Sequence, residues 1–392
     1  MYYFQEVFGG AIALNDNIHN YTPSIPYKIL NRYSDKGSDT LTQNKLNSFI
    51  KNLKNDDIFQ VEFPLYKDVI KRDNDFYTNE PIVDRFKYNK IASELGLNII
   101  DSVEITSYNN LKKFDTKGYK WWIKSNVTDI STCLYSESCI GQFSNVEYPI
   151  LLQKDIKAKF ESTIQFMVFN GHFCILGCST NYPTITDSGP KVGDSCHLIY
   201  WDIDRDYLYK RFKNIGKICK KYGINGHFEL DFLIDSKGKW WFMELLLGRF
   251  AITDSYGVLQ GLDMSYINLI ETLRKRDLKP NELKYKAKFT MGNCMFTNLI
   301  LSDYLKFESD LPNFKDGTTI LPISGRIKDN KYYATGLCRL FCICWSSDSW
   351  SKLKSHNFSI LESLNVPYPL YRTDFKNMNT FVRYITKNKI NI

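Results

Sequence analysis

The sequence predicts an α/β (α+β) protein. Three observations predict it: a length of 392 residues, a composition with 43% hydrophobic and 24% charged residues, and an alternation of strand-like and helix-like segments after residue 84. At roughly 100–200 residues per domain, such a chain holds two or three domains and buries a sizeable core. This composition excludes a disulfide-stapled miniprotein and a mostly disordered chain.

The apolar runs of the sequence are short. Phe341–Trp345, one of the longest, is far below the ~20 residues that a membrane-spanning helix needs. The first six residues show no basic segment followed by an apolar stretch, so we expect no signal peptide. We therefore expect a soluble, cytoplasmic protein with no membrane partner.

The net charge is +8, from 51 Lys and Arg against 43 Asp and Glu, and it is spread along the chain. This balance suits acidic small molecules such as nucleotides, and equally a solvated lysine-rich surface, so it names no partner. A nucleic-acid partner is not expected, because Trp121–Trp122 and Trp240–Trp241 fall in strands where at least one of each pair belongs to the core. No helix-turn-helix or RNP-like pattern accompanies them. The oligomeric state stays open.

The ten cysteines do not follow the pattern of a disulfide framework. Several lie in apolar, strand-like runs, where reduced cysteine packs as a small hydrophobic side chain. Cys174, Cys178, Cys196 and His197 do not have the paired spacing of zinc ligands. We expect neither a zinc site nor catalytic histidines.

Residues 1–83 are irregular, and we expect one helix there, Leu41–Leu53. Gly9–Gly10 lacks the third glycine of a dinucleotide-binding turn. The next segment, Asp84–Leu97, is predicted to be a helix because its apolar residues recur at helical spacing and Gly96 can end it.

Strands and helices then alternate to residue 280. We expect strands at Lys120–Lys124, Pro149–Gln153, Glu161–Asn170, His172–Cys178, His227–Ile234 and Lys239–Leu245, and helices at Tyr207–Tyr222 and Ser265–Arg276. The segment after Leu283 is β-rich. The predicted domains are 1–83, 84–280 and 281–392.

The strongest chemical signal is the predicted hairpin HFELDFLIDSKGKWWFMELL, which carries Asp231 on one strand and Glu244 on the other. Across this turn the two acids can lie opposite each other on one face of the sheet. Facing carboxylates repel unless a cation lies between them, and Mg²⁺ commonly uses one or two carboxylates plus substrate phosphates. The alternative is a hairpin with its acids, including Glu229, on a solvated face.

The order of the surrounding motifs resembles the ATP-grasp ligases, most closely the phosphoribosylamine–glycine ligase branch. The motifs are a strand that ends in Lys124, a strand that leads into a polar hinge at Gln153–Ile156, an acid at Glu161, and the acidic hairpin. The family's D-x-G-P-x-x-G-G loop is similar to residues 187–194, and Ser324-Gly325-Arg326 resembles its late glycine–arginine turn. The likeness covers residues 84–257, extends weakly into the C-terminal part, and fits the first eighty residues poorly.

The resemblance implies an ATP-grasp fold in which two α+β subdomains sandwich ATP, with an N-terminal pre-ATP-grasp domain and a C-terminal β-rich domain. It implies Mg²⁺ and ATP as cofactors, and a small-molecule carboxylate and an amine joined through an acyl phosphate in a reaction similar to one of purine biosynthesis or nucleotide modification. The implied site residues are Lys124 and Arg249 for catalysis, Lys124, Gln153, Lys154, Asp155, Ile156 and Glu161 for ATP, Asp187, Ser188, Gly189, Pro190 and Gly193 for the substrate, and Asp231 and Glu244 for the metal.

The sequence departs from the family in three places. Leu246 stands where the family's E-x-N motif has asparagine, Ser125–Leu134 contains no glycine where the family has a glycine-rich phosphate loop, and Asp194 replaces the second glycine of the substrate loop. These changes leave open a degenerate nucleotide-binding module that has lost catalysis. The preserved lysine and paired acids favour the enzyme.

Overall fold

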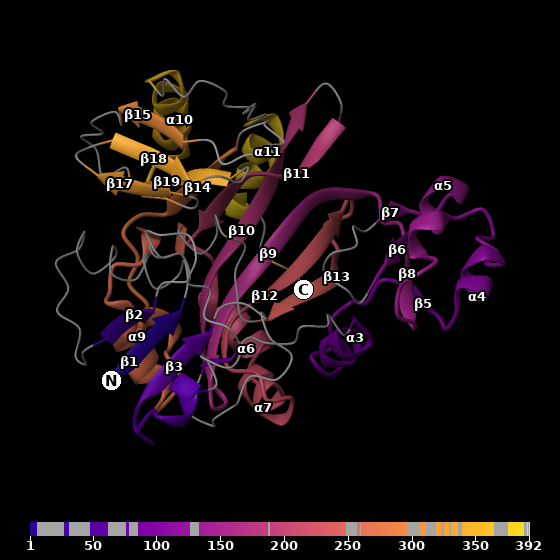
Figure 1. The fold of residues 1–392 in the computed structure, drawn as a ribbon, viewed down its shortest axis with the longest axis horizontal. Helices are drawn as coiled ribbons and strands as arrows, with labels where there is room; N and C mark the ends of the chain where they lie inside the picture. The colour runs from indigo at the N-terminus through magenta and orange to yellow at the C-terminus, as the bar shows by residue number, and fades with distance from the viewer. Residues whose placement is uncertain are drawn as a thin grey trace.

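The computed structural model describes residues 1–5, 27–30, 48–61, 76–77, 85–125, 133–186, 189–247, 257–258, 260–296, 306–310, 319–322, 325–328, 331–335, 339–363, 375–387, 390 and 392. Helices and antiparallel sheets together make an α+β fold, as the sequence predicts (Figure 1).

A large sheet forms the centre of the described structure. Its eight strands, in order, are β13 (Trp240–Leu247), β12 (Gly226–Asp235), β9 (Ala158–Phe169), β10 (His172–Thr186), β11 (Gly189–Tyr200), β14 (Phe289–Phe296), β19 (Arg339–Ser347) and β16 (Thr319–Pro322). All of their pairings are antiparallel. The predicted hairpin of β9 and β10 turns at Asn170–Gly171, where both residues have positive φ, as a tight two-residue turn requires.

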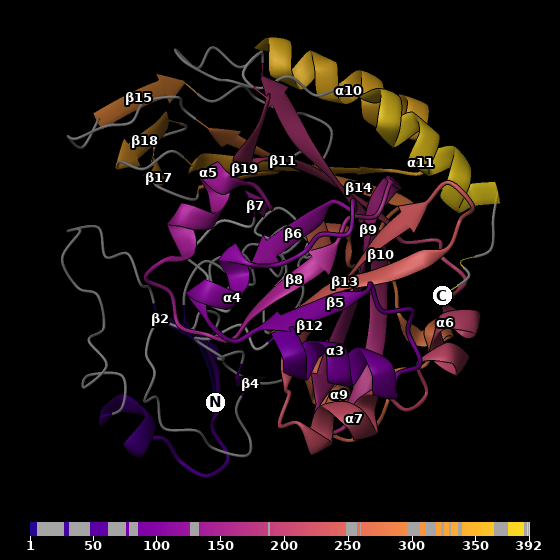
Figure 2. The same cartoon turned by 90° about the vertical axis from the view of Figure 1, so that its right-hand side faces the viewer.

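One face of this sheet is apolar and packs against helices. Phe166 of β9 and Phe228 of β12 stack with their ring centroids 4.9 Å apart, and Phe212 meets Phe166 edge-on. Helices α6 (Arg205–Arg211) and α7 (Ile215–Lys221) cover this core, with α3 (Arg85–Glu94) beside β13 and α11 (Phe375–Lys387) over one end (Figure 2). Because side chains alternate along a strand, the residues between these aromatics face the other side.

A smaller sheet makes a separate lobe, at the right of Figure 1. Its strands, in order, are β5 (Ser102–Ile105), β8 (Ile150–Lys154), β6 (Trp121–Lys124) and β7 (Cys133–Leu134), with α4 (Tyr108–Lys112), α5 (Glu137–Ile140) and η1 (Gly141–Phe143) on one side. Trp121, Ile123, Ile150 and Leu152 bury their side chains against these helices. The alternate residues Trp122, Lys124 and Gln153 therefore lie on the opposite face.

The remaining sheets lie at the two ends of the chain. The N-terminal one is parallel, with strands β2 (Tyr27–Leu30), β1 (Tyr2–Gln5), β3 (Ile58–Val61) and β4 (Phe76–Tyr77). The C-terminal one has β15 (Lys306–Asp310), β18 (Lys331–Thr335) and β17 (Gly325–Lys328), followed in the chain by α10 (Trp350–Ser363). Helix α9 (Tyr266–Leu273) and η2 (Pro280–Glu282) lie between β13 and β14 in sequence. No described helix is long and apolar enough to cross a membrane.

The structure corrects one predicted helix. The single helix expected at Tyr207–Tyr222 is two helices, α6 and α7, with a break at residues 212–214. The break lets Gly216 approach the turn between β9 and β10 so closely that a Cβ there would lie 1.8 Å from the carbonyl oxygen of Gly171. The apolar periodicity of the sequence reports neither the break nor this close packing.

The predicted domain boundaries stay predictions. The main sheet contains strands from both sides of residue 280, since β11 pairs with β14 in a continuous ladder from Cys196–Asn293 to Tyr200–Phe289. Of the helix expected at Leu41–Leu53, only residues 48–51 lie in a described helical segment.

Candidate functional site

Asp231 and Glu244 are direct register partners on β12 and β13, so the structure confirms that the two acids lie opposite each other on one face of the sheet. Asp231 is only 4% exposed and accepts a hydrogen bond from the hydroxyl of Thr163 on β9 at 2.7 Å. The same face carries Glu161, Gln165 and Glu229. We call this side of strands β9, β12 and β13 the polar face. Asp231 and Glu229 are both buried on this face, which excludes the solvated-hairpin alternative for these two acids.

Lys124 of the small sheet lies within electrostatic range of the acids on the polar face. Its side chain is buried at the end of β6, and burial lowers its pKa to about 8. The charges of Glu244, Glu161 and Asp231 raise that pKa again, whereas Arg85 lowers it. The residues predicted to contact phosphate, ribose and metal therefore share one electrostatic environment, although they come from two sheets. They are Lys124, Glu161, Asp231 and Glu244.

Arg85 also belongs to this environment, and the motif analysis missed it. Its Nη1 donates to Glu244 Oε2 at 2.7 Å and its Nε donates to the carbonyl oxygen of Ser125 at 3.0 Å. A signal was present in the sequence: Arg85 is the first residue of α3, where a positive charge opposes the helix dipole. An arginine at that position suggests a role outside the helix.

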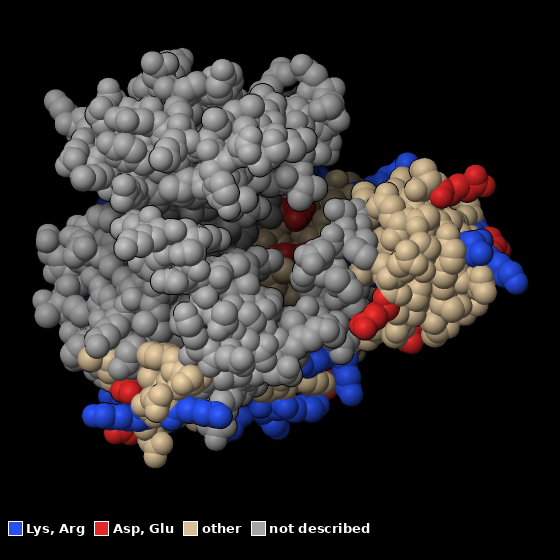
Figure 3. Space-filling view, viewed as in Figure 1, with Lys and Arg blue, Asp and Glu red and all other residues tan. Residues whose placement is uncertain are grey.

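The surface is hollowed between the large sheet and the small-sheet lobe (Figure 3). In the space-filling view, acidic side chains lie at the floor of a hollow beside the small-sheet lobe, in the region of β9 and β12 (Figure 3). A phosphate chain that enters it would meet two basic groups, Lys124 and Arg85. The carboxylates opposite them suit a divalent cation rather than a bare anion.

The predicted hinge lies at the end of β8. Gln153 is 3% exposed, and its Nε2 has no hydrogen-bond partner among the residues that the structure describes. Lys154 forms an ion pair with Asp101 at 3.6 Å and lies over the ring of Tyr119. The side chain of Asp155 accepts the indole N–H of Trp122 at 2.8 Å, and the carbonyl of Ile156 accepts the amide of Ala158. Of the predicted hinge side chains, Gln153 is the one with a buried, unused donor beside Lys124.

The segment expected to be a substrate loop is mostly a strand. Gly189, Pro190 and Gly193 belong to β11, which pairs with β10 through Thr186–Gly189 and Ile185–Pro190. The expected open loop is therefore wrong for these residues, because the two strands continue almost to the tip of the hairpin. Asp187 and Ser188 at the tip, Arg249, and most of the segment expected to cover the phosphates (126–132) lie outside the described residues.

Most of the described cysteines are buried and reduced, as the sequence predicts, and two form a disulfide. Cys174, Cys178, Cys219 and Cys344 are buried and form no disulfide, as expected, but Cys133 and Cys139 form a disulfide that was not anticipated, with Cα atoms 6.4 Å apart. The described residues contain no cluster of three or more metal-binding side chains.

His227 is buried and contacts the hydroxyl of Tyr266 on α9. Burial lowers the pKa of His227 to about 3, so it is neutral at physiological pH. Its contact with Tyr266 anchors α9 to the polar face, next to Glu229 and Asp231 along β12. We therefore assign His227 a structural role.

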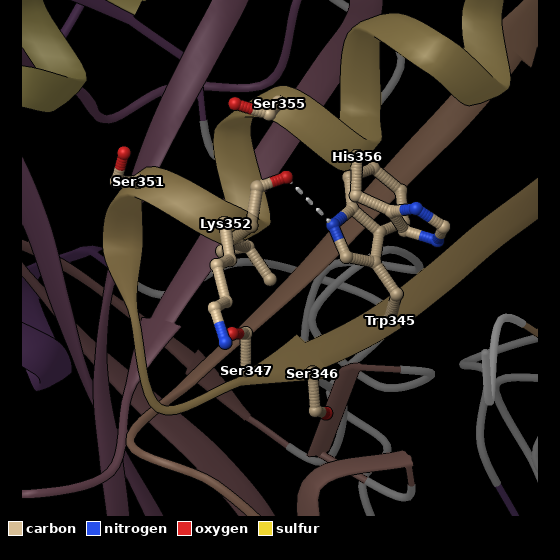
Figure 4. Close-up of a pocket in the computed structure, with 8 residues that line it drawn as sticks. Trp345, Ser346, Ser347, Ser351, Lys352, Ser355 and His356 are labelled. Carbon is tan, nitrogen blue, oxygen red and sulfur yellow. Dashed lines mark hydrogen bonds between the residues drawn. The ribbon is translucent and has the colours of Figure 1, made fainter.

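A second hollow of about 520 Å³ lies between β19 and α10, away from the polar face (Figure 4). It is lined by Trp345, Ser346, Ser347, Ser351, Lys352, Leu353, Ser355 and His356. The Trp345 indole donates to the carbonyl of Leu353 at 3.1 Å, and Ser346 shares a hydrogen bond with Thr290. None of the residues that the sequence singled out lies there, so we assign it no chemistry.

No family model matches the sequence, and no curated protein matches it significantly. Solved structures do match the fold. A phosphoribosylamine–glycine ligase from Thermotoga maritima matches with a TM-score of 0.69 at 14% identity, covering 95% of this chain and 99% of that one.

Two further structures match over similar lengths. The biotin carboxylase domain of a 2-oxoglutarate carboxylase from Hydrogenobacter thermophilus, solved with MgADP and bicarbonate, matches with a TM-score of 0.63 at 12% identity, covering 94% of this chain and 91% of that one. An L-amino acid ligase from Bacillus licheniformis matches with a TM-score of 0.61 at 11% identity, covering 95% of this chain and 98% of that one. The chain therefore has the ATP-grasp fold, and the predicted resemblance is confirmed at the level of fold.

Proposed function

We propose that this protein is an ATP-dependent ligase that joins a carboxylate to an amine through an acyl phosphate. The observation that carries the proposal is the contact that Arg85 makes with both sheets: it donates to the carbonyl of Ser125, which follows Lys124 in the small sheet, and to Glu244, the register partner of Asp231 in the large sheet. The proposed substrate is an amino acid or a nucleotide-related compound; the names of two structures that share the fold, a phosphoribosylamine–glycine ligase and an L-amino acid ligase, support this class.

Each group has a proposed place along ATP. Lys124 offers a point charge to phosphate oxygens, and Arg85 offers a second charge beside it. The hinge at residues 153–156 would bind the adenine edge, and the unused Gln153 amide supports this assignment. Glu161 would accept the ribose hydroxyls.

The donor set of the polar face fits Mg²⁺. Asp231 and Glu244 supply carboxylate oxygens from paired strands, and Mg²⁺ commonly combines one or two carboxylates with phosphate oxygens and waters. When bound, Mg²⁺ neutralises charge on the β- and γ-phosphates. Leu246 supplies no ligand, so we expect a weak metal site that depends on the nucleotide.

The proposed reaction has two steps. A carboxylate oxygen of the substrate attacks the γ-phosphorus, and ADP leaves as the bond to its β-phosphate oxygen breaks. The amine then attacks the acyl carbon, the carbon–oxygen bond to phosphate breaks, and the nitrogen loses a proton as the amide forms. In this proposal Lys124 and Arg85 stabilise the charge on the transferred phosphoryl group. Arg249 is a further candidate for that role, and residues 187–193 remain candidates for substrate binding.

The test is ADP release in the presence of Mg-ATP, measured across panels of amino acids, ribosylamines and nucleotide-related acids. A productive pair should release ADP only when both partners are present. Glu244→Gln should abolish this release without unfolding the protein, since it keeps the size of the side chain and removes its charge. Glu137→Gln, at an exposed helix position, is the matched control and should behave as wild type.

Leu246 favours a second candidate, a nucleotide-binding module without turnover. That module would show nucleotide-dependent stabilisation in a thermal-shift assay with Mg-ATP or Mg-ADP, but no ADP release with any substrate pair. Full activity of Glu244→Gln would overturn the proposed ligase mechanism.

A further inference from the structure

The ion pair between Arg85 and Glu244 joins separate parts of the molecule. Arg85 starts α3, Glu244 lies on β13, and the second acceptor of the guanidinium, the carbonyl of Ser125, follows directly after Lys124 at the end of β6. The two side chains are mostly buried, with 14% of Arg85 and 25% of Glu244 exposed. A charge-assisted contact of this length, held by a second hydrogen bond, has a defined geometry.

The carboxylate that Arg85 binds is one of the two proposed metal ligands. Its register partner, Asp231, accepts a hydrogen bond from the Thr163 hydroxyl. Leu246, two residues after Glu244 on β13, stands where the E-x-N motif has its asparagine and supplies no ligand. The guanidinium of Arg85 therefore already supplies positive charge to Glu244, one of the two proposed metal ligands. A divalent cation on Glu244 would lie close to Arg85, and like charges at such short range repel strongly in a buried site.

We propose that Arg85 competes with the divalent cation for Glu244 and keeps the metal site closed until a nucleotide arrives. The inference rests on the proposed Mg-ATP function. Incoming phosphate oxygens are strong acceptors for a guanidinium. They draw Arg85 away from Glu244 and simultaneously bring ligands to the cation. The metal then enters with the nucleotide, not before it, and Leu246 strengthens this order because the protein alone offers too few oxygens.

The experiment titrates Mn²⁺, as a spectroscopic substitute for Mg²⁺, into nucleotide-free protein and follows free Mn²⁺ by electron paramagnetic resonance. Wild type should bind Mn²⁺ weakly. Arg85→Gln should bind it about tenfold or more tightly, because the competing charge is gone. The double variant Arg85→Gln, Glu244→Gln should lose that gain, which assigns the new affinity to Glu244.

Two control variants exclude simpler explanations. Arg85→Lys keeps the charge but not the two-acceptor geometry, and it should bind Mn²⁺ more weakly than Arg85→Gln does. Arg276→Gln removes an arginine from an exposed pair with Glu282, 2.7 Å apart and distant in sequence from the site, and should leave Mn²⁺ affinity unchanged. Circular dichroism confirms that each variant is folded. An Arg85→Gln protein that is folded and binds Mn²⁺ no more tightly than wild type overturns the competition.

A separate calorimetric titration with Mg-ATP distinguishes this failure from that of the proposed function. Because the Mn²⁺ titration contains no nucleotide, it measures only whether Arg85 competes with the cation for Glu244. Absence of Mg-ATP binding to wild type would refute the nucleotide site, whatever the Mn²⁺ result. Mg-ATP binding with unchanged Mn²⁺ affinity in Arg85→Gln would refute only the competition.

Discussion

Leu246 lies directly opposite Glu229 in the ladder of β12 and β13, two residues along from the Asp231–Glu244 pair. An apolar side chain thus occupies the position next to the two proposed metal ligands. Restoring an oxygen there by Leu246→Asn should lower the Mg²⁺ concentration needed for ATP binding by about tenfold, the equivalent of roughly 1.4 kcal/mol. Calorimetric titration of ATP at a series of Mg²⁺ concentrations measures this change.

Leu246→Ala is the control for this substitution. It removes the leucine without adding a ligand, so its Mg²⁺ requirement should match that of wild type. If the asparagine and alanine variants behave alike, the position does not face the cation and the assignment of the metal to this part of the polar face is wrong.

The hydroxyl of Thr163 donates to Asp231 in a buried setting, at 2.7 Å. Removal by Thr163→Val leaves the carboxylate without this donor and should destabilise the protein by about 1.5–3 kcal/mol, the scale of a hydrogen bond to a charged group. Thr163→Ser keeps the hydroxyl, so this variant should lose much less stability. Chemical denaturation of both variants measures the difference, and a Thr163→Val protein as stable as wild type would show that this hydrogen bond does not contribute to stability.

Much of the site could be predicted from the sequence because it depends on local patterns. Apolar runs of strand length identified β6, β8, β12 and β13, and the turn at residues 235–238 fixed the distance between Asp231 and Glu244. Alternation along each strand then placed both acids on one face, as the register shows. Of the two tryptophan pairs, Trp121 and Trp240 are the buried members, which agrees with the prediction that one of each pair is core.

Other features could not be predicted because they depend on contacts between distant segments. Arg85 and Glu244 are 159 residues apart, and nothing local to either reveals their ion pair. The break between α6 and α7 accompanies the approach of Gly216 to Gly171. The Cys133–Cys139 pair joins the short strand β7 to the short helix α5, and neither element has a strong periodic signal.

The approach of Gly216 to Gly171 predicts a strong effect of a single methyl group. Gly216→Ala would place a Cβ 1.8 Å from a backbone oxygen, so helix α7 must shift and the protein should lose about 1–3 kcal/mol of stability or more. Gly141→Ala is the matched control, since its Cβ meets nothing within 4 Å and its φ is −55°. It should be neutral or stabilise by about 0.4–1 kcal/mol. Thermal unfolding of both variants decides, and a stable Gly216→Ala protein would refute the close contact.

The charge of Lys124 predicts how ATP binding depends on pH. Burial lowers its pKa to about 8, while the neighbouring acids Glu244, Glu161 and Asp231 partly oppose that shift and Arg85 adds to it. Below this pKa the side chain carries the positive charge that phosphate oxygens need. Above it the free protein holds a neutral amine, and binding must first take up a proton. Affinity for ATP should therefore fall as the pH rises through about 8, by up to tenfold per pH unit.

Calorimetry of Mg-ATP binding between about pH 7 and pH 9.5 tests this dependence, and buffers with different ionisation enthalpies count the protons taken up. Lys124→Arg keeps its charge throughout the range because a guanidinium does not titrate there, so its affinity should be nearly independent of pH. Lys124→Ala should bind ATP more weakly by roughly 1–3 kcal/mol at the lower pH and should take up no proton. The wild-type curve should thus approach that of the alanine variant as the pH rises. Parallel curves for wild type and Lys124→Ala would show that another group titrates, and Lys124 would then lose its place at the phosphates.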